Sequence, residues 1–211
     1  MPDTSASLYE QLFPLTTVMK QRFVENFSGD ALDTDRWTHS DLTGTGSSGI
    51  SDSVDGGGFV KSGGGSADAS QMAFNGVGQY AYNASVCIGV TKTATTTSFS
   101  RFGFTSNGTT ATNLNIADFE NNSSDTYTSL RSGDASTTSV INSTTAQHVN
   151  WTAIKLELTA SNIVLYEEGV STATKTTNLP VASLEPILRI ESASVATVKE
   201  ISVRYMECYN T

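Results

Sequence analysis

The chain has 211 residues and a formal charge of −9, and only 16% of its residues are charged. Its twelve lysines and arginines are scattered, so the chain lacks the clustered positive charge that nucleic acid or an anionic membrane surface requires. Ser, Thr, Asn and Gly supply most of the polar residues, while nine Phe, seven Tyr and two Trp can build a core. This composition favours one domain of short β-strands joined by turns.

The first 21 residues differ from the rest. Apolar residues recur there at three- or four-residue spacing, and Pro14 predicts short helical turns rather than one continuous helix. The stretch lacks the pattern of a secretory signal, and no run of 18 apolar residues predicts a membrane span. We expect an N-terminal arm over residues 1–21 that packs on its own domain or docks on a partner. The side chains expected to dock are apolar: Leu8, Leu12, Phe13, Leu15 and Val18.

Period-two alternation begins after Arg22 and continues to the end of the chain. It is clear in "YAYNASVCIGV" (80–90), "NWTAIKLELTA" (150–160) and "VKEISVRYMECY" (198–209). A tight turn is predicted at Glu168–Gly169. Counting such segments gives about 12 to 14 short strands. Residues 22–211 are therefore predicted to form an all-β, antiparallel two-sheet sandwich.

Three short motifs resemble those of the concanavalin A-like lectin/glucanase superfamily. "FSGDALDTDRW" (27–37) is similar to the F-x-G-x-x-L-D-x-x-x-W segment that brings the chain onto the sandwich. Residues 151–176 resemble a strand and hairpin ending in Y-x-D-G, with Glu168 in place of the aspartate. Residues 198–209 resemble the closing strand of glucanase-type members. The resemblance implies a jelly-roll fold more firmly than an activity. The residues expected to anchor this fold are Phe27, Gly29, Leu32, Trp37, Trp151 and Gly169.

The glucanase branch carries E-x-D-x-E or E-x-D-x-x-E on a central strand, where alternation places the acids on one face. This chain contains no E-x-D. Asp118 and Glu120, in "NIADFENN", are the nearest equivalent and should share a face. The simpler interpretation is a solvent-facing strand end, so we expect no catalytic pair, with Asp118 and Glu120 as the only weak candidates.

No metal site is predicted. Asp30, Asp33 and Asp35 lack the spacing and the following Glu of a calcium loop, and Asp33 and Asp35 are expected to bond the backbone of a turn. His39 and His148 lie far apart in sequence, with no Cys or His spacing typical of zinc.

No cofactor is expected either. "GTGSSG" (44–49) matches G-x-G-x-x-G, but it is polar on both sides and predicts a loop rather than a dinucleotide site. Cys87 and Cys208 could form a disulfide if their strands lie side by side. The alternative is that they are two small buried hydrophobes.

Sugar binding would need aromatic platforms beside amide or carboxylate groups. Tyr80 and Tyr82, predicted to share a strand face, together with Asn83 and Tyr127, are the weak candidates for such a site.

Three functions fit these observations, and we rank them in this order. The first is a non-enzymatic structural protein at a virion surface, such as a decoration or head-fibre protein that docks through its arm on the major capsid protein of a phage-like particle. The second is a lectin-like module that binds surface glycans, and the third is a divergent glycoside hydrolase. A homo-oligomer is a further expectation, whereas nucleic-acid and membrane partners are not expected.

Overall fold

A computed structural model describes residues 22–51, 57–75, 80–93, 98–106, 115–122, 125–192 and 197–211. The expected arm, residues 1–21, lies outside these ranges, together with its docking residues. In the described ranges fifteen strands run from Arg22 to Asn210. They are β1 (Arg22–Glu25), β2 (Trp37–Thr43), β3 (Ser47–Ile50), β4 (Gly58–Lys61), β5 (Ala69–Phe74), β6 (Ser85–Thr93), β7 (Ser98–Thr105), β8 (Ile116–Asn122), β9 (Tyr127–Gly133), β10 (Thr138–Ala146), β11 (Thr152–Leu158), β12 (Ile163–Glu167), β13 (Val170–Lys175), β14 (Glu185–Ser192) and β15 (Glu200–Asn210).

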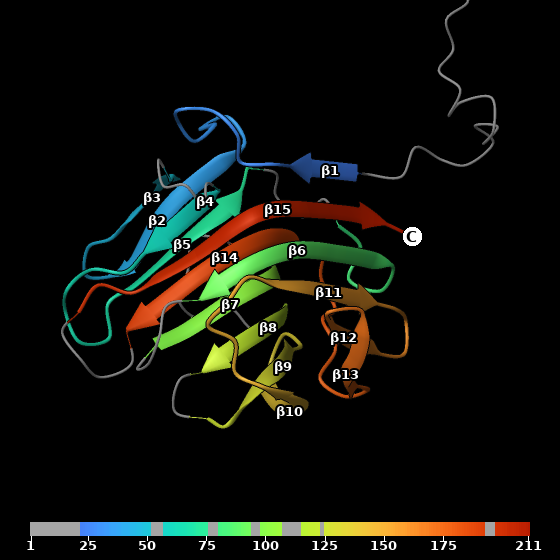
Figure 1. Cartoon of the computed structure of the whole chain (residues 1–211). Coiled ribbons are helices and arrows are strands. Elements are labelled where there is room, and N and C mark those ends of the chain that lie inside the picture. The colour runs from blue at the N-terminus through green and yellow to red at the C-terminus, as the bar shows by residue number, and fades with distance from the viewer. Residues whose placement is uncertain are drawn as a thin grey trace, which may run out of the picture.

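The strands form two packed sheets (Figure 1). Sheet A has the order β13-β12-β11-β6-β15-β4-β3, and β1 also pairs with β15. Sheet B has the order β10-β9-β8-β7-β14-β5-β2. The pairings are antiparallel throughout the described strands. The predicted all-β, antiparallel two-sheet sandwich is therefore confirmed.

Alternation along each strand decides which side chains enter the core between the sheets. In β11 every second residue, from Thr152 to Leu158, is buried, and β12 repeats the pattern. Leu156 and Leu165 are cross-strand partners and both are buried. Burying a side chain of this size is worth about 1.5–3 kcal/mol, so the period-two pattern fixes which face of sheet A meets sheet B.

An aromatic cluster joins β1 and the segment after it to sheet B. The Trp37 ring lies 5.5 Å from both Phe23 and Phe27 and 5.8 Å from Phe74, measured between ring centroids. Phe27 and Trp37 are buried, and Leu32 packs against the same core. The stretch 27–37 thus fastens β1 and β2 to the sandwich through aromatic contacts, which contribute more than their buried area alone.

One glycine allows an aromatic ring of sheet B to reach sheet A. A Cβ on Gly89 of β6 would lie 2.4 Å from Cζ of Phe102, a residue of β7 in the other sheet. Real Cβ atoms do not approach so closely, so only glycine leaves room for the Phe102 ring at this point. Close packing of the two sheets at this point therefore requires a residue without a side chain at position 89.

Cys87 and Cys208 are cross-strand partners on β6 and β15. Both are free and buried, and their Sγ atoms lie 3.0 Å apart. Burial, followed by the neighbouring Cys87, raises the pKa of the Cys208 thiol. The condition for a disulfide, adjacent strands, is met, while the two sulfur atoms are not bonded to each other.

Several local expectations have definite outcomes. The turn at Glu168–Gly169 is confirmed, and its φ angles of 51° and 81° suit a two-residue hairpin. The expectation of a loop over 44–49 is wrong in part, because β3 begins at Ser47 and pairs with β4. The strands outnumber the expected 12 to 14 because β1 and β3, four residues each, are too short to show alternation.

The described part contains no helix long and apolar enough to cross a membrane.

Candidate functional site

Strand β8 brings the two candidate acids to the middle of sheet B. Asp118 and Glu120 alternate with Ala117 and Phe119, which are buried in the core. Both carboxylates therefore project from the opposite face of the sheet, away from sheet A. The expectation that they share a face is confirmed. The expectation of a solvent-facing strand end is wrong, because Asp118 is 0% exposed.

Each carboxylate is bound by an arginine from a neighbouring strand. Arg131 of β9 is the cross-strand partner of Asp118, and its Nε and Nη2 donate to Oδ1 and Oδ2 at 3.1 and 2.8 Å. Arg101 of β7 is the cross-strand partner of Glu120 and donates from Nε to Oε2 at 2.6 Å. Arg131 Nε also lies 3.9 Å from Glu120 Oε2. The two acids are thus held by two arginines, one of which contacts both.

Strand β14 extends this arrangement with Arg189 and Glu191. Arg101 Nη1 lies 3.5 Å, and Arg189 Nη2 3.3 Å, from the same oxygen of Glu191, Oε2. Three arginines and three carboxylates therefore balance one another across four adjacent strands. We call this set the charged cluster: Arg101, Asp118, Glu120, Arg131, Arg189 and Glu191.

The pKa values of two arginines reflect their places in the charged cluster. Burial lowers the pKa of Arg189 to about 10. The neighbouring Arg101 guanidinium also acts to lower this pKa, whereas the Glu191 carboxylate acts to raise it. Burial also acts to lower the pKa of Arg131, but the charge and hydrogen bonds of Asp118 outweigh it, so this pKa stands above its ordinary value. Arg131 is therefore the cation that its carboxylate neighbours stabilise most clearly.

Glycoside hydrolysis needs one carboxyl that protonates the leaving group and a second that attacks the sugar or activates water. In the charged cluster, both oxygens of Asp118 and one oxygen of Glu120 already accept hydrogen bonds from guanidinium groups. Bidentate arginine–carboxylate contacts are among the stronger hydrogen bonds in proteins. Removing one partner of a buried pair costs about 3–5 kcal/mol, so these contacts hold the face of sheet B together.

Sequence reasoning found the acids of the charged cluster on β8 but missed the arginines. The available signal was a single arginine inside an otherwise apolar or small-residue strand, as in "SFSRFGFTS" (98–106), and an arginine two residues before a glutamate in "PILRIESAS" (186–194). A charged side chain at such a position needs a partner when it is buried. A lone arginine in a strand does not identify the carboxylate that it pairs with, because the order of strands in the sheet decides which side chains meet.

A second buried polar cluster lies between the two sheets near β10 and β13. Glu167 of β12 accepts hydrogen bonds from His148 Nε2 at 2.6 Å, Thr172 Oγ1 at 2.7 Å and Thr128 Oγ1 at 2.9 Å. Thr128 also contacts Ser143 Oγ at 2.5 Å. These residues come from both sheets, so the carboxylate joins sheet A to sheet B. We call this set the Glu167 cluster.

Burial acts to raise the pKa of Glu167, but hydrogen bonds from His148, Thr172 and Thr128 outweigh burial and lower it. Glu167 precedes Glu168, the residue that stands for the aspartate of the Y-x-D-G resemblance. The Glu168 side chain instead accepts from the backbone N–H of Ala153 at 2.7 Å, beside the hairpin turn. Period-two alternation places Glu167 on the buried face of β12 with Ile163 and Leu165, whereas Glu168 lies in the turn beyond that strand.

The two histidines bind different carboxylates. His39 Nε2 lies 2.9 Å from Asp41 Oδ1 on β2, whereas His148 contacts Glu167. The Asp33 side chain accepts from the backbone N–H of Asp35 at 3.0 Å, as expected for a turn. In the described ranges no group of three or more His, Cys, Asp or Glu side chains is arranged to hold a metal.

The four sugar-binding candidates are dispersed. Tyr80 is 0% exposed and forms an isolated bridge with Leu184, while Tyr82 and Asn83 lie in an exposed turn. The expectation that Tyr80 and Tyr82 share a strand face is therefore wrong, since the chain turns before β6. Tyr127 is 43% exposed and begins β9, on the face of sheet B that carries Arg131.

The anchor Trp151 lies half-buried just before β11, outside the core. The Arg204 guanidinium stacks over its ring at 4.1 Å from the ring centroid, and Lys92 Nζ lies 5.9 Å from it. Gly29 has a φ of 111°, and Gly169 one of 81°, so both occupy turns that favour glycine.

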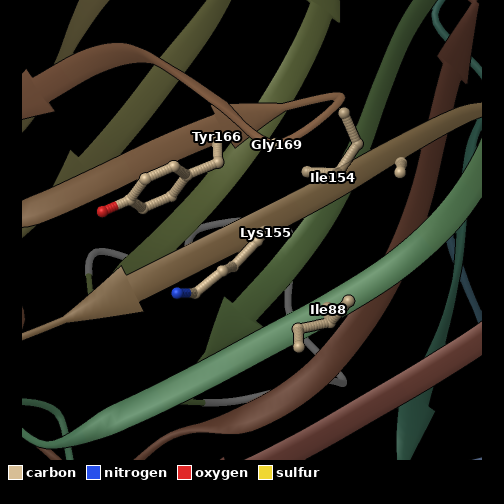
Figure 2. Close-up of a pocket in the computed structure, with 6 residues that line it drawn as sticks. Ile88, Ile154, Lys155, Tyr166 and Gly169 are labelled. Carbon is tan, nitrogen blue, oxygen red and sulfur yellow. The ribbon is translucent and has the colours of Figure 1, made fainter.

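A pocket of about 320 Å³ lies on sheet A near the turn between β12 and β13 (Figure 2). Lys155, Tyr166 and Ile88 form a cross-strand row on the face away from the core. Lys155 Nζ lies 4.7 Å from the Tyr166 ring centroid and 2.8 Å from Glu157, so its charge is already compensated. None of the residues singled out as a ligand or catalytic candidate lines this pocket.

Comparison with known proteins defines the fold class. No family model and no curated protein matches the chain. A native glycosidic hydrolase has 17% identity and a TM-score of 0.67, covering 92% of this chain and 97% of that one. The β-glucanase of Bacillus licheniformis has 16% identity and a TM-score of 0.63, covering 90% and 98%. A pseudo β-1,3-glucanase of Mycobacterium tuberculosis, also an immunostimulatory antigen, has 11% identity and a TM-score of 0.61, covering 90% and 98%.

The chain thus has the concanavalin A-like β-sandwich fold that these glycoside hydrolases also have. This confirms the fold that the sequence resemblance implied. At these identities the likeness concerns the fold alone, and the activity has to be argued from the side chains.

Proposed function

We propose that this chain is a non-enzymatic structural or binding protein built on a glucanase-type sandwich. The observation that carries the proposal is the pairing of Asp118 and Glu120 with Arg131 and Arg101. A catalytic pair must exchange a proton with the sugar and reach its anomeric carbon. Asp118, with both oxygens bound by Arg131, and Glu120, with one oxygen bound by Arg101, are poorly suited to both tasks.

The comparison with the Mycobacterium tuberculosis protein is compatible with a non-enzymatic role. That protein has this fold and is described as a pseudo β-1,3-glucanase. Enzymes with this sandwich are also among the matches, so fold alone favours neither outcome. The charged cluster is the feature that favours a non-enzymatic role.

An activity assay tests the proposal. The purified chain is incubated with β-1,3-glucan and mixed-linkage glucan, and released reducing sugar is measured for wild type, Glu120→Gln and Glu157→Gln. Glu157 is the matched control, because it lies on sheet A and pairs with Lys155. We expect no turnover by any of the three. Turnover by wild type and Glu157→Gln that disappears in Glu120→Gln would show that the chain is a hydrolase.

Within the non-enzymatic class we propose a subunit of a larger assembly, namely a decoration or head-fibre protein at the surface of a phage-like capsid. The supports are the low charge fraction, the Ser/Thr/Gly-rich sandwich and the apolar stretch at 1–21. A stable contact of this arm with a capsid subunit would bury on the order of 1,000 Å² or more. Deleting residues 1–21 should leave a folded sandwich that no longer joins the particle, and normal incorporation of the truncated chain would exclude docking through the arm.

A lectin-like module is the second candidate, favoured by Tyr127. Its exposed ring lies on the face of sheet B that also carries Asn142 and Ser129, so it could stack on a sugar beside amide and hydroxyl groups. A glycan array followed by calorimetry tests this function. Tyr127→Ala should abolish binding, while Tyr82→Ala, which removes an exposed tyrosine elsewhere, should not. Binding that survives Tyr127→Ala would exclude this face.

A further inference from the structure

Strand β10 forms an open edge of the sandwich. It is the last strand of sheet B and pairs with β9 alone within that sheet (Figure 1). Val140, on the face of Arg131, is 50% exposed, and Ile141, on the opposite face with Leu130, is 41% exposed. Of the nine residues in β10 only Ser143 is buried. A strand exposed on its free edge and on both faces can accept another strand.

Natural edge strands usually carry charges, prolines or short lengths that prevent such pairing. The sequence of β10, "TSVINSTTA", has no charged residue, no proline and no glycine. The other terminal strands of the two sheets differ: β2 contains Asp41, β13 ends at Lys175, β3 is only four residues long, and β1, which pairs with β15 alone, is short and charged. Strand β10 is therefore the longest terminal strand without charge in the described sheets.

The absence of charge points to a second copy of this chain as the partner. In an antiparallel pair about a two-fold axis, a residue at the axis faces its own copy, so a charge at that point of the strand would face the same charge on the second molecule. The chain carries −9 overall, and two copies repel each other over most of their surfaces. Strand β10 adds no charge of its own to this repulsion.

We propose that β10 pairs antiparallel with β10 of a second copy, about a two-fold axis that passes by Val140. The regular pairing of β10 with β9 covers Thr138–Asn142, whose centre is Val140, and the register shifts after Asn142. Such pairing continues sheet B across both molecules and buries Val140 and Ile141 of each. Lys175 reaches the inner face of β10 from β13, where its Nζ donates to Ser139 Oγ at 2.6 Å.

This inference does not depend on the proposed function. One added strand per subunit lies at the small end of interfaces that form stable complexes, which bury about 1,200–2,000 Å². The backbone hydrogen bonds and the two apolar side chains therefore predict a reversible dimer that depends on concentration, with no need for further contacts.

Sedimentation velocity from low micromolar to near-millimolar concentration tests the dimer. The wild-type chain should pass from monomer to dimer over this range. Val140→Lys and Val140→Asp each place like charges beside the axis and should weaken the dimer by at least about tenfold. An equimolar mixture of the two variants should dimerise again, because opposite charges then face each other across the axis.

The matched control is Val181→Lys, which adds the same charge at a residue that is 57% exposed outside β10. It should dimerise like wild type, and thermal melts should show that all variants are folded. A wild-type chain that stays monomeric, a Val140→Lys variant that dimerises normally, or a mixture that stays monomeric would each overturn the proposal. Growth into fibres or open oligomers would also overturn it, because a two-fold contact closes at two copies.

Discussion

The Glu167 cluster makes a quantitative prediction about stability. Replacing Glu167 with Gln keeps the size of the side chain but removes its charge and turns one acceptor oxygen into a donor. In the wild type the carboxylate accepts from His148, Thr172 and Thr128 while almost fully buried. A hydrogen bond to a charged group contributes about 1.5–3 kcal/mol, and an unsatisfied buried donor costs a similar amount.

Glutamine can keep part of this network, so we expect Glu167→Gln to lose about 3 kcal/mol of unfolding free energy at pH 7. For a domain of this size that loss lowers Tm by about 6–12 °C. Urea unfolding followed by tryptophan fluorescence gives the free energy directly. The matched control is Glu157→Gln, which breaks a half-exposed pair with Lys155 and should cost less than about 1 kcal/mol.

The same variant has a defined pH dependence. The pKa of Glu167 is lowered in the folded chain, whereas an unfolded glutamate titrates near pH ~4.3. A group with a lowered folded pKa stabilises fully above its unfolded pKa, and this contribution disappears as the pH falls through the folded pKa. The stability gap between wild type and Glu167→Gln should therefore narrow as the pH falls below ~4.3. A gap no larger than that of Glu157→Gln, or one that widens in acid, would refute the reasoning.

Three further predictions concern other buried positions. Asp118→Ala should destabilise the chain by about 3–5 kcal/mol, measured by urea unfolding, because Arg131, whose side chain is 16% exposed, loses its bidentate partner and keeps only the longer contact with Glu120. Gly89→Ala should cost about 1–3 kcal/mol in the same assay, because the added methyl overlaps an aromatic ring of β7. Cys87 and Cys208 should react with a thiol reagent only as fast as the chain unfolds, because both are fully buried.

For each variant one result would contradict the expected change in stability or labelling rate. Asp118→Ala with wild-type stability would mean that the Arg131 guanidinium becomes hydrated without a cost in free energy. The charged cluster would then not stabilise sheet B. Gly89→Ala at wild-type stability would show that the opposing ring moves without cost. Rapid labelling of both thiols in the folded chain, at urea concentrations far below the unfolding midpoint, would show that the strands β6 and β15 separate locally.

Local sequence determined the class of the fold and the direction of many side chains. Alternation in "NWTAIKLELTA" gave a strand with Leu156 and Leu158 on the buried side, and the structure has both there. The same periodicity placed Asp118 and Glu120 on one face. These features depend only on the two-residue repeat of an extended chain, which a single segment reveals by itself.

The tertiary structure decided what those side chains meet. Arg189 of β14 reaches the charged cluster because β14 lies beside β7, although β14 comes much later in the chain. Glu167 and Thr128 meet only because the two sheets pack face to face. Sheet order and register come from interactions between distant segments, so no window of sequence contains them. The sequence by itself determined a strand-rich sandwich with two acids on one face, and the packing of the sheets bound those acids to arginines.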